Sequence, residues 1–419
     1  MMAGWKFVLL LLAATSLTSL QASETEPLRF WKDIKGREII GELVASDGLR
    51  VTLRVEDNSK KVLPLTFLCE ADRQFIATWR KQYPQAPWVD PETMPAWPQN
   101  LGKGPVKVHR MPADDQSSDY IYRSPHFELR SDIELPLFAV SDIATVFEAT
   151  RIALHSLPLG LAASPPASEM QLRWQHKYPS LKYDPDLLRV QFYHNRESFA
   201  QSGAASGSGG FYDPLKNRTF LSLTNLGIHK DKTLSRSDYI KNTFVLKHEI
   251  THHLLHDWFP YLPLWFQEGF AEYIGAAPYS QGRYRFTSID RHLHQYLNKW
   301  RFDEDPKRIP MMKMEDLMSS QHGDWDARLQ RNTPILEYNS AALLVHFFIH
   351  HDDKGNAAHL AAYLHAIRQG VPAPEAEKLH LLRQRTYPQL ASEIRQVWKK
   401  QGVTLIRHGE YDPFKRRSN

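Results

Sequence analysis

The chain has 419 residues, of which 42% are hydrophobic and 24% are charged, and its formal net charge is +5 at pH 7. This is the composition of globular domains with a buried core, and the length predicts two or three domains. The lysines and arginines are spread along the sequence and form no stripe, which argues against a nucleic-acid partner.

Residues 1–22 have the order of a secretory signal peptide. Lys6 precedes an apolar run from Phe7 to Ala14, and small residues follow up to Ala22, where we expect cleavage. The apolar run is too short to span a bilayer comfortably, and no later stretch predicts an integral membrane segment. The chain has one cysteine, so an intrachain disulfide is not available. We therefore expect a secreted or periplasmic protein.

Residues 29–80 predict a small all-β unit. Alternating apolar and polar residues at 38–44 and 50–55, two turn dipeptides and a further apolar run at 62–65 predict an antiparallel barrel. The unit resembles the SH3-like homology domain first described in cytoskeletal adaptors, with matching residues at Trp31, Gly36, Asp47-Gly48, Val51, Leu53, Pro64-Leu65, Leu68 and Asp72. A structural barrel and a barrel that binds a protein or glycan partner both stay open.

Residues 81–117 predict a stiff linker, because they are rich in proline and lack a helical period. A larger domain is expected over residues 118–402, and a basic tail over 403–419. Within the domain, the patterning predicts a strand at 126–132, a helix at 140–157, a strand at 189–193, a short helix around 197–200 and a hairpin in GGFYDPLKNRTFLSL.

The window KHEITHHLLHDWF, residues 247–259, contains the pattern H-E-x-x-H. Apolar residues at helical spacing predict a helix here, which Pro260 ends. On that helix His248 and His252 lie one turn apart on one face, close enough to share a metal ion. Glu249 then stands beside the ion, where a base acting on metal-bound water is needed. Surface histidines of an amphipathic helix are the alternative.

A second helix is predicted in LWFQEGFAEYIG, residues 264–275, with Pro263 near its start and Gly275 at its end. Glu268 and Glu272 share one face of this helix. We expect Glu268 to complete a His-His-Glu zinc site that leaves a fourth position for water. We expect Glu272 to accept a hydrogen bond from a ligand imidazole, with an exposed helix carboxylate as the alternative.

The sequence HEITH followed by PLWFQEGFAEY resembles the gluzincin metallopeptidases, in particular the compact peptidase-MA-like families, over roughly residues 118–400. The resemblance implies an α+β zincin-like domain finished by helices, one Zn²⁺ ion and hydrolysis of peptide bonds, with Glu249 as general base. It also implies a donor to the reacting carbonyl oxygen, for which Tyr338 is our candidate; a core tyrosine is the alternative. The G-x-M-E-N signature of the large aminopeptidases is absent, so endo- and exopeptidase activity both stay open.

The hairpin that contains Gly210 and Tyr212 is expected to present an edge strand above the zinc, where a peptide or protein substrate pairs through its backbone. A plain loop and strand start is the alternative. Five further histidines are expected to be ordinary helix residues, namely His253, His256, His346, His350 and His351.

Two other functions stay open. One is a non-catalytic binding or scaffold protein that retains a zinc site, and the other is a hydrolase of another amide, such as a cell-wall crosslink. Structural zinc sites usually close all four positions with protein ligands, whereas this pattern supplies three ligands and a base. The sequence therefore favours a zinc metallopeptidase.

Overall fold

The structure of the protein, a computed structural model, describes residues 29–46, 50–55, 59–82, 94–112, 118–162, 187–205, 207–229, 243–299, 305, 307–321, 323–325, 334–368 and 371–407. The predicted signal peptide and the predicted tail from residue 408 onward lie outside these residues. Within the described part of the chain, no helix combines the length and the apolar character needed to cross a membrane.

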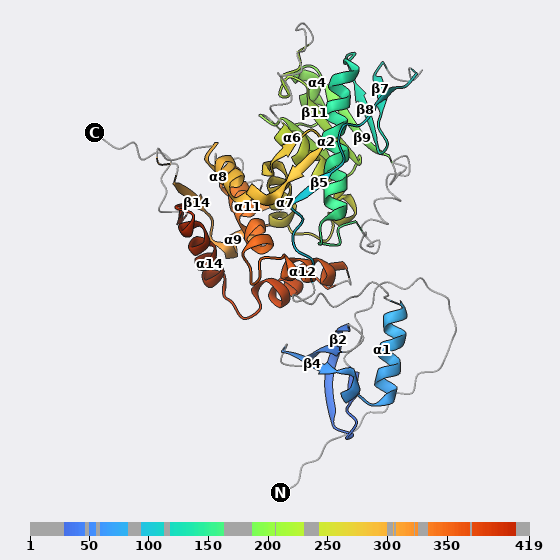
Figure 1. Cartoon of the computed structure of the whole chain (residues 1–419), viewed down its shortest axis with the longest axis vertical. Coiled ribbons are helices and arrows are strands. Elements are labelled where there is room, and N and C mark those ends of the chain that lie inside the picture. Colours follow the sequence, from blue (N-terminus) through green and yellow to red (C-terminus); the bar gives the residue numbers. More distant parts are fainter. Residues whose placement is uncertain are drawn as a thin grey trace, which may run out of the picture.

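The N-terminal unit is a four-stranded antiparallel sheet followed by a helix (Figure 1). Its elements are β1 (Arg29–Lys32), β2 (Glu38–Ser46), β3 (Arg50–Val55), β4 (Lys60–Pro64), the 3-10 turn η1 (Leu65–Phe67) and α1 (Glu70–Gln82). Trp31 and Val51 of the sheet are fully buried against Ile76 of α1. These strands confirm the predicted alternation, but the described residues do not close into a barrel. A lone bridge between Asp33 and Leu68 brings the chain back beside the end of β1.

The larger unit is built on a mixed sheet of six strands in the order β10-β11-β9-β8-β7-β6. The central pairs β8–β9 and β9–β11 are parallel and the outer pairs antiparallel. The strands are β6 (His109–Arg110), β7 (Tyr120–Arg123), β8 (Phe127–Ser131), β9 (Leu188–Tyr193), β10 (Gly210–Asp213) and β11 (Arg218–Ser222), with helices α2 (Leu137–Ser156) and α4 (Arg196–Gln201) between them. These elements match the strands, helices and hairpin expected in this region within a few residues.

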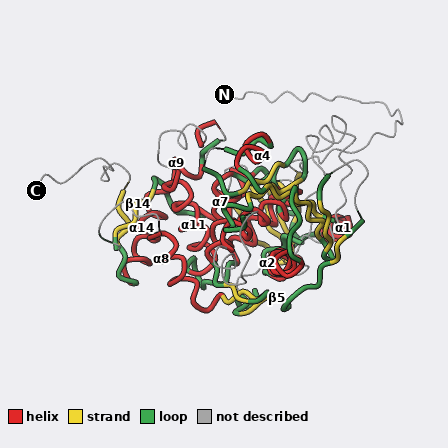
Figure 2. Tube along the Cα trace, turned by 90° about the horizontal axis from the view of Figure 1, so that it is seen from above, coloured by secondary structure: helices red, strands yellow, loops and turns green. Residues whose placement is uncertain are grey.

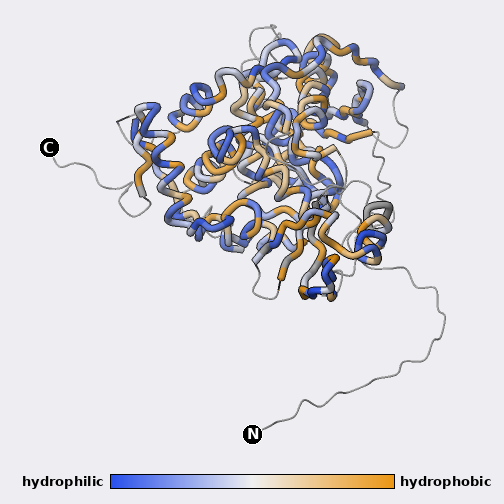
Figure 3. Tube along the Cα trace, turned by 60° about the horizontal axis from the view of Figure 1, so that its bottom comes forward, coloured by the Kyte–Doolittle hydropathy of each residue, from blue (hydrophilic) through white to orange (hydrophobic). Residues whose placement is uncertain are grey.

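Helices α2 and α6 (Thr243–Leu254) pack on the same side of this sheet. Leu129, Val190 and Leu221 of the sheet form one buried cluster with Phe147 of α2 and Ile250 of α6. Figure 3 shows hydrophobic and hydrophilic stretches alternating within single elements, which lets each element bury one face. Helix α6, which carries the H-E-x-x-H pattern, is therefore held against the sheet by its apolar side chains.

Helices make up most of the rest of the larger unit. In Figure 2 the strands of the large sheet lie near α2, and most of these helices lie on the opposite side of the molecule. The helices are α7 (Leu264–Ala276), α8 (Ile289–Lys299), α9 (Met314–Met318), α11 (Pro334–His350), α12 (Ala358–Arg368), α13 (Ala373–Ala376), a π-helical segment (Glu377–Leu382) and α14 (Tyr387–Lys400). A short 3-10 turn, η3 (His256–Trp258), follows α6, and another, η4 (Phe286–Ser288), precedes α8. Two small sheets complete the unit. One contains β5 (Asn100–Gly102), β12 (Tyr279–Ser280) and β13 (Arg283–Arg285), and the other contains β14 (Arg308–Met311) and β15 (Thr404–Arg407).

Two glycines let α7 lie close to both of its neighbouring helices. A Cβ atom on Gly269 would stand 2.4 Å from the backbone oxygen of Ala341 in α11, and one on Gly275 would stand 2.6 Å from the Phe244 ring of α6. Gly275 is thus a close-contact residue inside α7, which continues to Ala276. This close packing brings the acidic face of α7 next to the histidines of α6.

Part of the predicted linker belongs to the larger unit. The ring of Trp97 packs edge-on against Tyr273 and Phe286, with centroids 6.2 and 6.1 Å apart. β5 pairs with β13, and the Val106 amide donates to Thr145 Oγ1 of α2 at 3.0 Å. Proline disfavours the interior of a helix but allows an extended segment to lie on a folded surface, and residues 94–112 make such contacts. Likewise, the predicted tail begins with β15, which pairs with β14.

Candidate metal centre

Helix α6 is buried along the turns that carry the motif, from Leu246 to His253. Lys247 anchors the helix to the end of α7, because its Nζ donates to the Ala277 carbonyl at 2.7 Å. Burial lowers the pKa of this lysine to about 7. The helix ends at Leu254, earlier than predicted, and η3 completes the segment before Pro260. The histidines of the motif are therefore interior residues, which rules out the alternative of a solvated histidine face.

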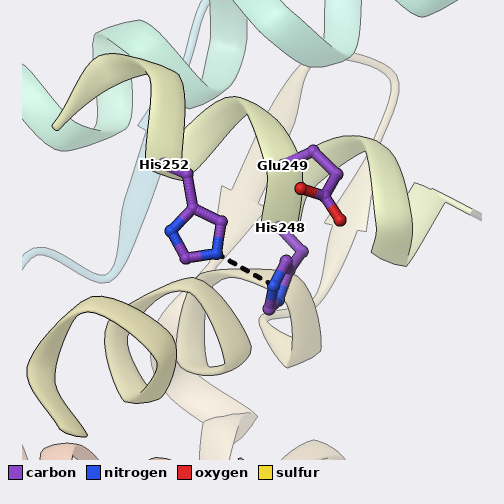
Figure 4. A group of neighbouring side chains, drawn as sticks. All are labelled: His248, Glu249 and His252. Carbon is purple, nitrogen blue, oxygen red and sulfur yellow. Dashed lines mark hydrogen bonds between the residues drawn. The ribbon is translucent and has the colours of Figure 1, made fainter. Parts of the chain in front are cut away.

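Three atoms that could ligate a metal converge between α6 and α7, and we call them the metal-ligating triangle. The Nε2 atoms of His248 and His252 are 3.1 Å apart, and their rings turn toward each other from one helix (Figure 4). Oε2 of Glu268 lies 3.6 Å from the first nitrogen and 3.4 Å from the second. A tetrahedral ion with bonds of about 2.0–2.1 Å separates its ligand atoms by about 3.3–3.4 Å. The triangle therefore has the size that a single zinc-like divalent ion requires.

Histidines and carboxylates of the site shift one another's pKa values. Burial lowers the pKa of His248, but the neighbouring carboxylates of Glu268 and Glu272 outweigh it and raise that pKa well above its ordinary value. Burial raises the pKa of Glu268, but the imidazoles of His252 and His248 outweigh it and lower that pKa. The site thus favours positive charge at its centre, which a divalent cation would supply in place of protons.

Glu272 lies beside His248, on the side of the ring that faces away from the metal-ligating triangle. Its Oε1 is 3.2 Å from Nδ1 of His248, the ring nitrogen that does not face Glu268. The residue is 4% exposed, so it is not an exposed helix carboxylate. A carboxylate in this position fixes the orientation and tautomer of a ligand imidazole. Glu272 thus lies at ion-pair distance from His248 Nδ1 without a hydrogen bond between them, and its supporting role stays a prediction.

Glu249 stands beside the triangle on the same helix (Figure 4). Ligand atoms of His248, Glu249 and His252 all lie within 4.8 Å of one another. Burial raises the pKa of Glu249, although the two imidazoles act in the opposite direction. A Cβ atom on Gly210 would lie 2.8 Å from Cγ of Glu249, so the glycine leaves the space that this side chain occupies.

Tyr338, near the start of α11, lies next to the site. Its ring is 6.4 Å from the ring of His248, and it lines the same cavity as Glu268, with a volume of about 1030 Å³. Burial raises the pKa of Tyr338, and the carboxylates of Glu268 and Glu272 raise it further. The phenol therefore keeps its proton at neutral pH and is a hydrogen-bond donor.

Strand β10 forms one edge of the six-stranded sheet, next to α6. The Ser222 amide of β11 donates to the Gly209 carbonyl. In an antiparallel pair, residues whose backbone groups bond to the partner strand alternate with residues whose groups point away from it. The backbone groups of Gly210 and Tyr212 therefore point away from β11, toward the open edge of the sheet. Ser208 Oγ donates to the outward carbonyl of Gly210. Strand β10 of the hairpin is thus an edge strand, and residues 210–213 are not a plain loop.

The side chain of Tyr212 takes part in packing. Its hydroxyl bonds to Nδ1 of His256 and donates to Oδ1 of Asn217 at 3.0 Å, and its ring stacks on His253 at 4.9 Å. His253 Nδ1 also pairs with Thr219 Oγ1 at 3.0 Å. Both histidines pack against the hairpin, His253 from α6 and His256 from the 3-10 turn η3. Because its side chain is engaged in these contacts, Tyr212 would bind a substrate through its backbone groups.

Tyr296 of α8 is a neighbour of the site that the sequence does not indicate. Its ring stacks on Phe244 at 4.5 Å, and burial together with the adjacent Glu272 carboxylate raises its pKa well above the ordinary value. In an amphipathic helix such a tyrosine is expected in the core, and no pattern links it to a carboxylate in α7.

No family model matches this chain, and no curated protein matches it in sequence. The chemistry available at the site follows from the donor set alone. Two imidazoles and one carboxylate could hold a divalent ion, a buried carboxylate stands beside them, and a phenol and an edge strand border the same region.

Proposed function

We propose that the protein is a zinc metallopeptidase of the gluzincin type, which hydrolyses peptide bonds with an activated water. The observation that carries this proposal is the triangle of His248 Nε2, His252 Nε2 and Glu268 Oε2, with sides of 3.1, 3.4 and 3.6 Å. Three protein ligands leave the fourth position of a tetrahedral ion for water, as in catalytic zinc sites. Glu249 beside this triangle is the group that a purely structural site does not need.

His248, His252 and Glu268 would hold the zinc ion, which would supply a water of lowered pKa and a positive charge to polarise the carbonyl of the substrate. Glu249 takes the proton from the attacking water and returns it to the departing amine. Tyr338 donates a hydrogen bond to the carbonyl oxygen as negative charge develops on it. Glu272 holds His248 in the tautomer that offers Nε2 to the ion.

The substrate is proposed to be an extended peptide or protein segment. The outward backbone groups of Gly210 and Tyr212 offer hydrogen bonds to a strand laid along β10, once Ser208 Oγ releases both the carbonyl and the amide of Gly210. The cavity of about 1030 Å³ that Glu268 and Tyr338 line has room for a substrate of several residues.

For the N-terminal unit we propose an SH3-like barrel that engages a protein or glycan partner. The consecutive order β1-β2-β3-β4 and the bridge from Asp33 to Leu68 support this assignment. Phe30, Ile34 and Phe67 are 60, 64 and 50% exposed, and exposed aromatic and aliphatic side chains of this kind serve as contact residues.

The decisive experiment is the substitution Glu249→Gln in the full chain. We expect the variant to retain zinc and to lose peptide-library hydrolysis by about 10²–10⁴-fold, the usual contribution of a general base. Glu197→Gln, at an exposed position in the first turn of α4, is the matched control. Undiminished hydrolysis by Glu249→Gln would exclude the proposed base. A wild-type protein that holds zinc but cleaves no peptide would favour a scaffold or a hydrolase of another amide.

A further inference from the structure

A second group of metal-ligating side chains lies between α8 and the end of α11. Asp290 is in the first turn of α8, His346 is in α11, and His351 directly follows the end of α11. Oδ1 of Asp290 is 2.7 Å from Nε2 of His346 and 3.8 Å from Nε2 of His351. One ligand atom from each of the three residues lies within 4.8 Å of the others.

The surroundings of the three residues resemble those of a metal site. His346 is fully buried, and the ring of Trp398 in α14 packs against it at 5.5 Å. Gln401 donates to Oδ2 of Asp290 at 3.2 Å, which leaves the other oxygen turned toward the histidines. Hydrogen bonds that orient a ligand and an apolar wall around it are typical of metal sites.

An alternative explanation is a hydrogen-bonded histidine–aspartate pair that joins two helices. This explains the contact between His346 and Asp290 but not the position of His351. The hydrogen bond between His346 and Asp290 leaves Nε2 of His351 buried and without a hydrogen-bond partner. A divalent ion uses this nitrogen as well as the other two ligand atoms. The side chain of Asp290 is 43% exposed, so an ion and a water ligand can reach the group from solvent.

This group is separate from the first site. Both border α11, but Tyr338 lies near the start of the helix, and His346 is more than two turns further along, about 12 Å at 1.5 Å per residue. The intervening turns are filled by core residues such as Leu343 and Leu344.

We propose that Asp290, His346 and His351 form a second divalent-metal site, which fastens α8 to the end of α11. Two imidazoles and one carboxylate suit zinc and related first-row ions, whereas calcium and magnesium prefer oxygen ligands throughout. The ion requires the contact between His346 and Asp290 to open from 2.7 Å toward about 3.3 Å. Because Gln401 bonds to the same aspartate, the site also fastens the segment that leads from α14 to β15.

The test is the zinc content of the full chain after dialysis against zinc-containing buffer and removal of excess metal. We expect two equivalents in the wild-type protein and one equivalent in each of Asp290→Asn and His351→Gln. These two positions are partly exposed, and a melting curve checks that each variant folds. His292→Gln, on the same helix as Asp290, is the control and keeps two equivalents.

The first site serves as an internal reference. His252→Gln keeps one equivalent, and added zinc still raises its melting temperature, whereas the double variant His252→Gln/Asp290→Asn holds none and shows no rise. A single wild-type equivalent that is lost in His252→Gln and kept in Asp290→Asn overturns the second site and leaves the proposed peptidase intact. Two equivalents retained by both Asp290→Asn and His351→Gln overturn it equally.

Discussion

Oε1 of Glu272 lies 3.2 Å from Nδ1 of His248, so one imidazole is approached by carboxylates at both of its nitrogens. When a metal ion binds Nε2 of such a ring, a carboxylate beside Nδ1 favours the tautomer that keeps the remaining proton on Nδ1. Glu272 and Glu268 are one turn apart on α7, and the close contact at Gly275 holds that helix against α6. We therefore expect the orientation of His248 to depend on Glu272, which is not among the three proposed metal ligands.

Glu272→Gln is expected to weaken zinc binding by about 10–100-fold, because the amide is a poorer acceptor and does not fix the tautomer. Competition with a chromophoric chelator measures the affinity. Hydrolysis by the variant should recover at high zinc concentration, and Glu197→Gln should match the wild type. An unchanged zinc affinity would show that Glu272 does not position the ligand.

Tyr338→Phe is expected to lower kcat by about 10²–10³-fold with little change in KM, as removal of a donor to the developing oxyanion does. Zinc content should stay at the wild-type level. Tyr193→Phe, in β9, is the control. If kcat and KM both match the wild type, Tyr338 is a packing residue beside Trp325, whose ring lies 5.7 Å away.

Gly210→Ala is expected to lower hydrolysis more than it lowers zinc binding. The added Cβ would meet Cγ of Glu249 at 2.8 Å and Cδ2 of Leu221 at 2.6 Å, so the base must shift. Gly209→Ala is a matched control, because its nearest contacts are 3.3 Å or longer. Comparison of kcat, zinc content and melting temperature separates displacement of Glu249 from unfolding. Equal activity of the two variants would contradict this account.

The metal-ligating triangle could be predicted from the sequence because its geometry is largely local. His248 and His252 are neighbours on any α-helix, and a short turn carries the chain to the helix with Glu268. The group of Asp290, His346 and His351 could not be predicted, since Asp290 and His346 are 56 residues apart and meet only through tertiary packing. His346 and His351 have a spacing that zinc ligands can adopt, but the sequence does not show which carboxylate would join them.

Extended segments were predicted less completely, because local composition does not show which surface such a segment contacts. Prolines around Trp97 predicted a linker, yet the tryptophan reaches the core beside α7. In the N-terminal unit, alternation predicted the strands, but barrel closure depends on a long-range contact such as the one between Asp33 and Leu68.

Trp97→Ala is expected to lower the free energy of unfolding of the larger unit by about 2–4 kcal/mol, through loss of a partly buried aromatic side chain. Urea unfolding followed by circular dichroism measures the change. Pro95→Ala, at an exposed position in the same segment, should have little effect. If both substitutions leave the urea midpoint unchanged, residues around Trp97 act as the spacer that the sequence predicts.

Glu377, in the wall of the cavity, should make stability fall as the pH rises. Burial raises its pKa from 4.5 to about 7, although the Tyr387 hydroxyl donates to Oε1 at 3.0 Å and opposes the shift. Between these values the folded state holds a proton that the unfolded state has released, so the contribution is full below pH about 4.5 and is lost as the pH rises through about 7.

Glu377→Gln stays neutral throughout, and should therefore gain roughly 2–3 kcal/mol relative to the wild type between pH about 5 and about 8, at 1.36 kcal/mol per pKa unit. Urea unfolding at the two pH values measures this difference. Glu375→Gln, at an exposed position two residues earlier, should follow the wild-type pH dependence. Parallel curves for the wild type and Glu377→Gln would mean that the carboxylate is ionised in the folded protein, with Tyr387 as a sufficient partner.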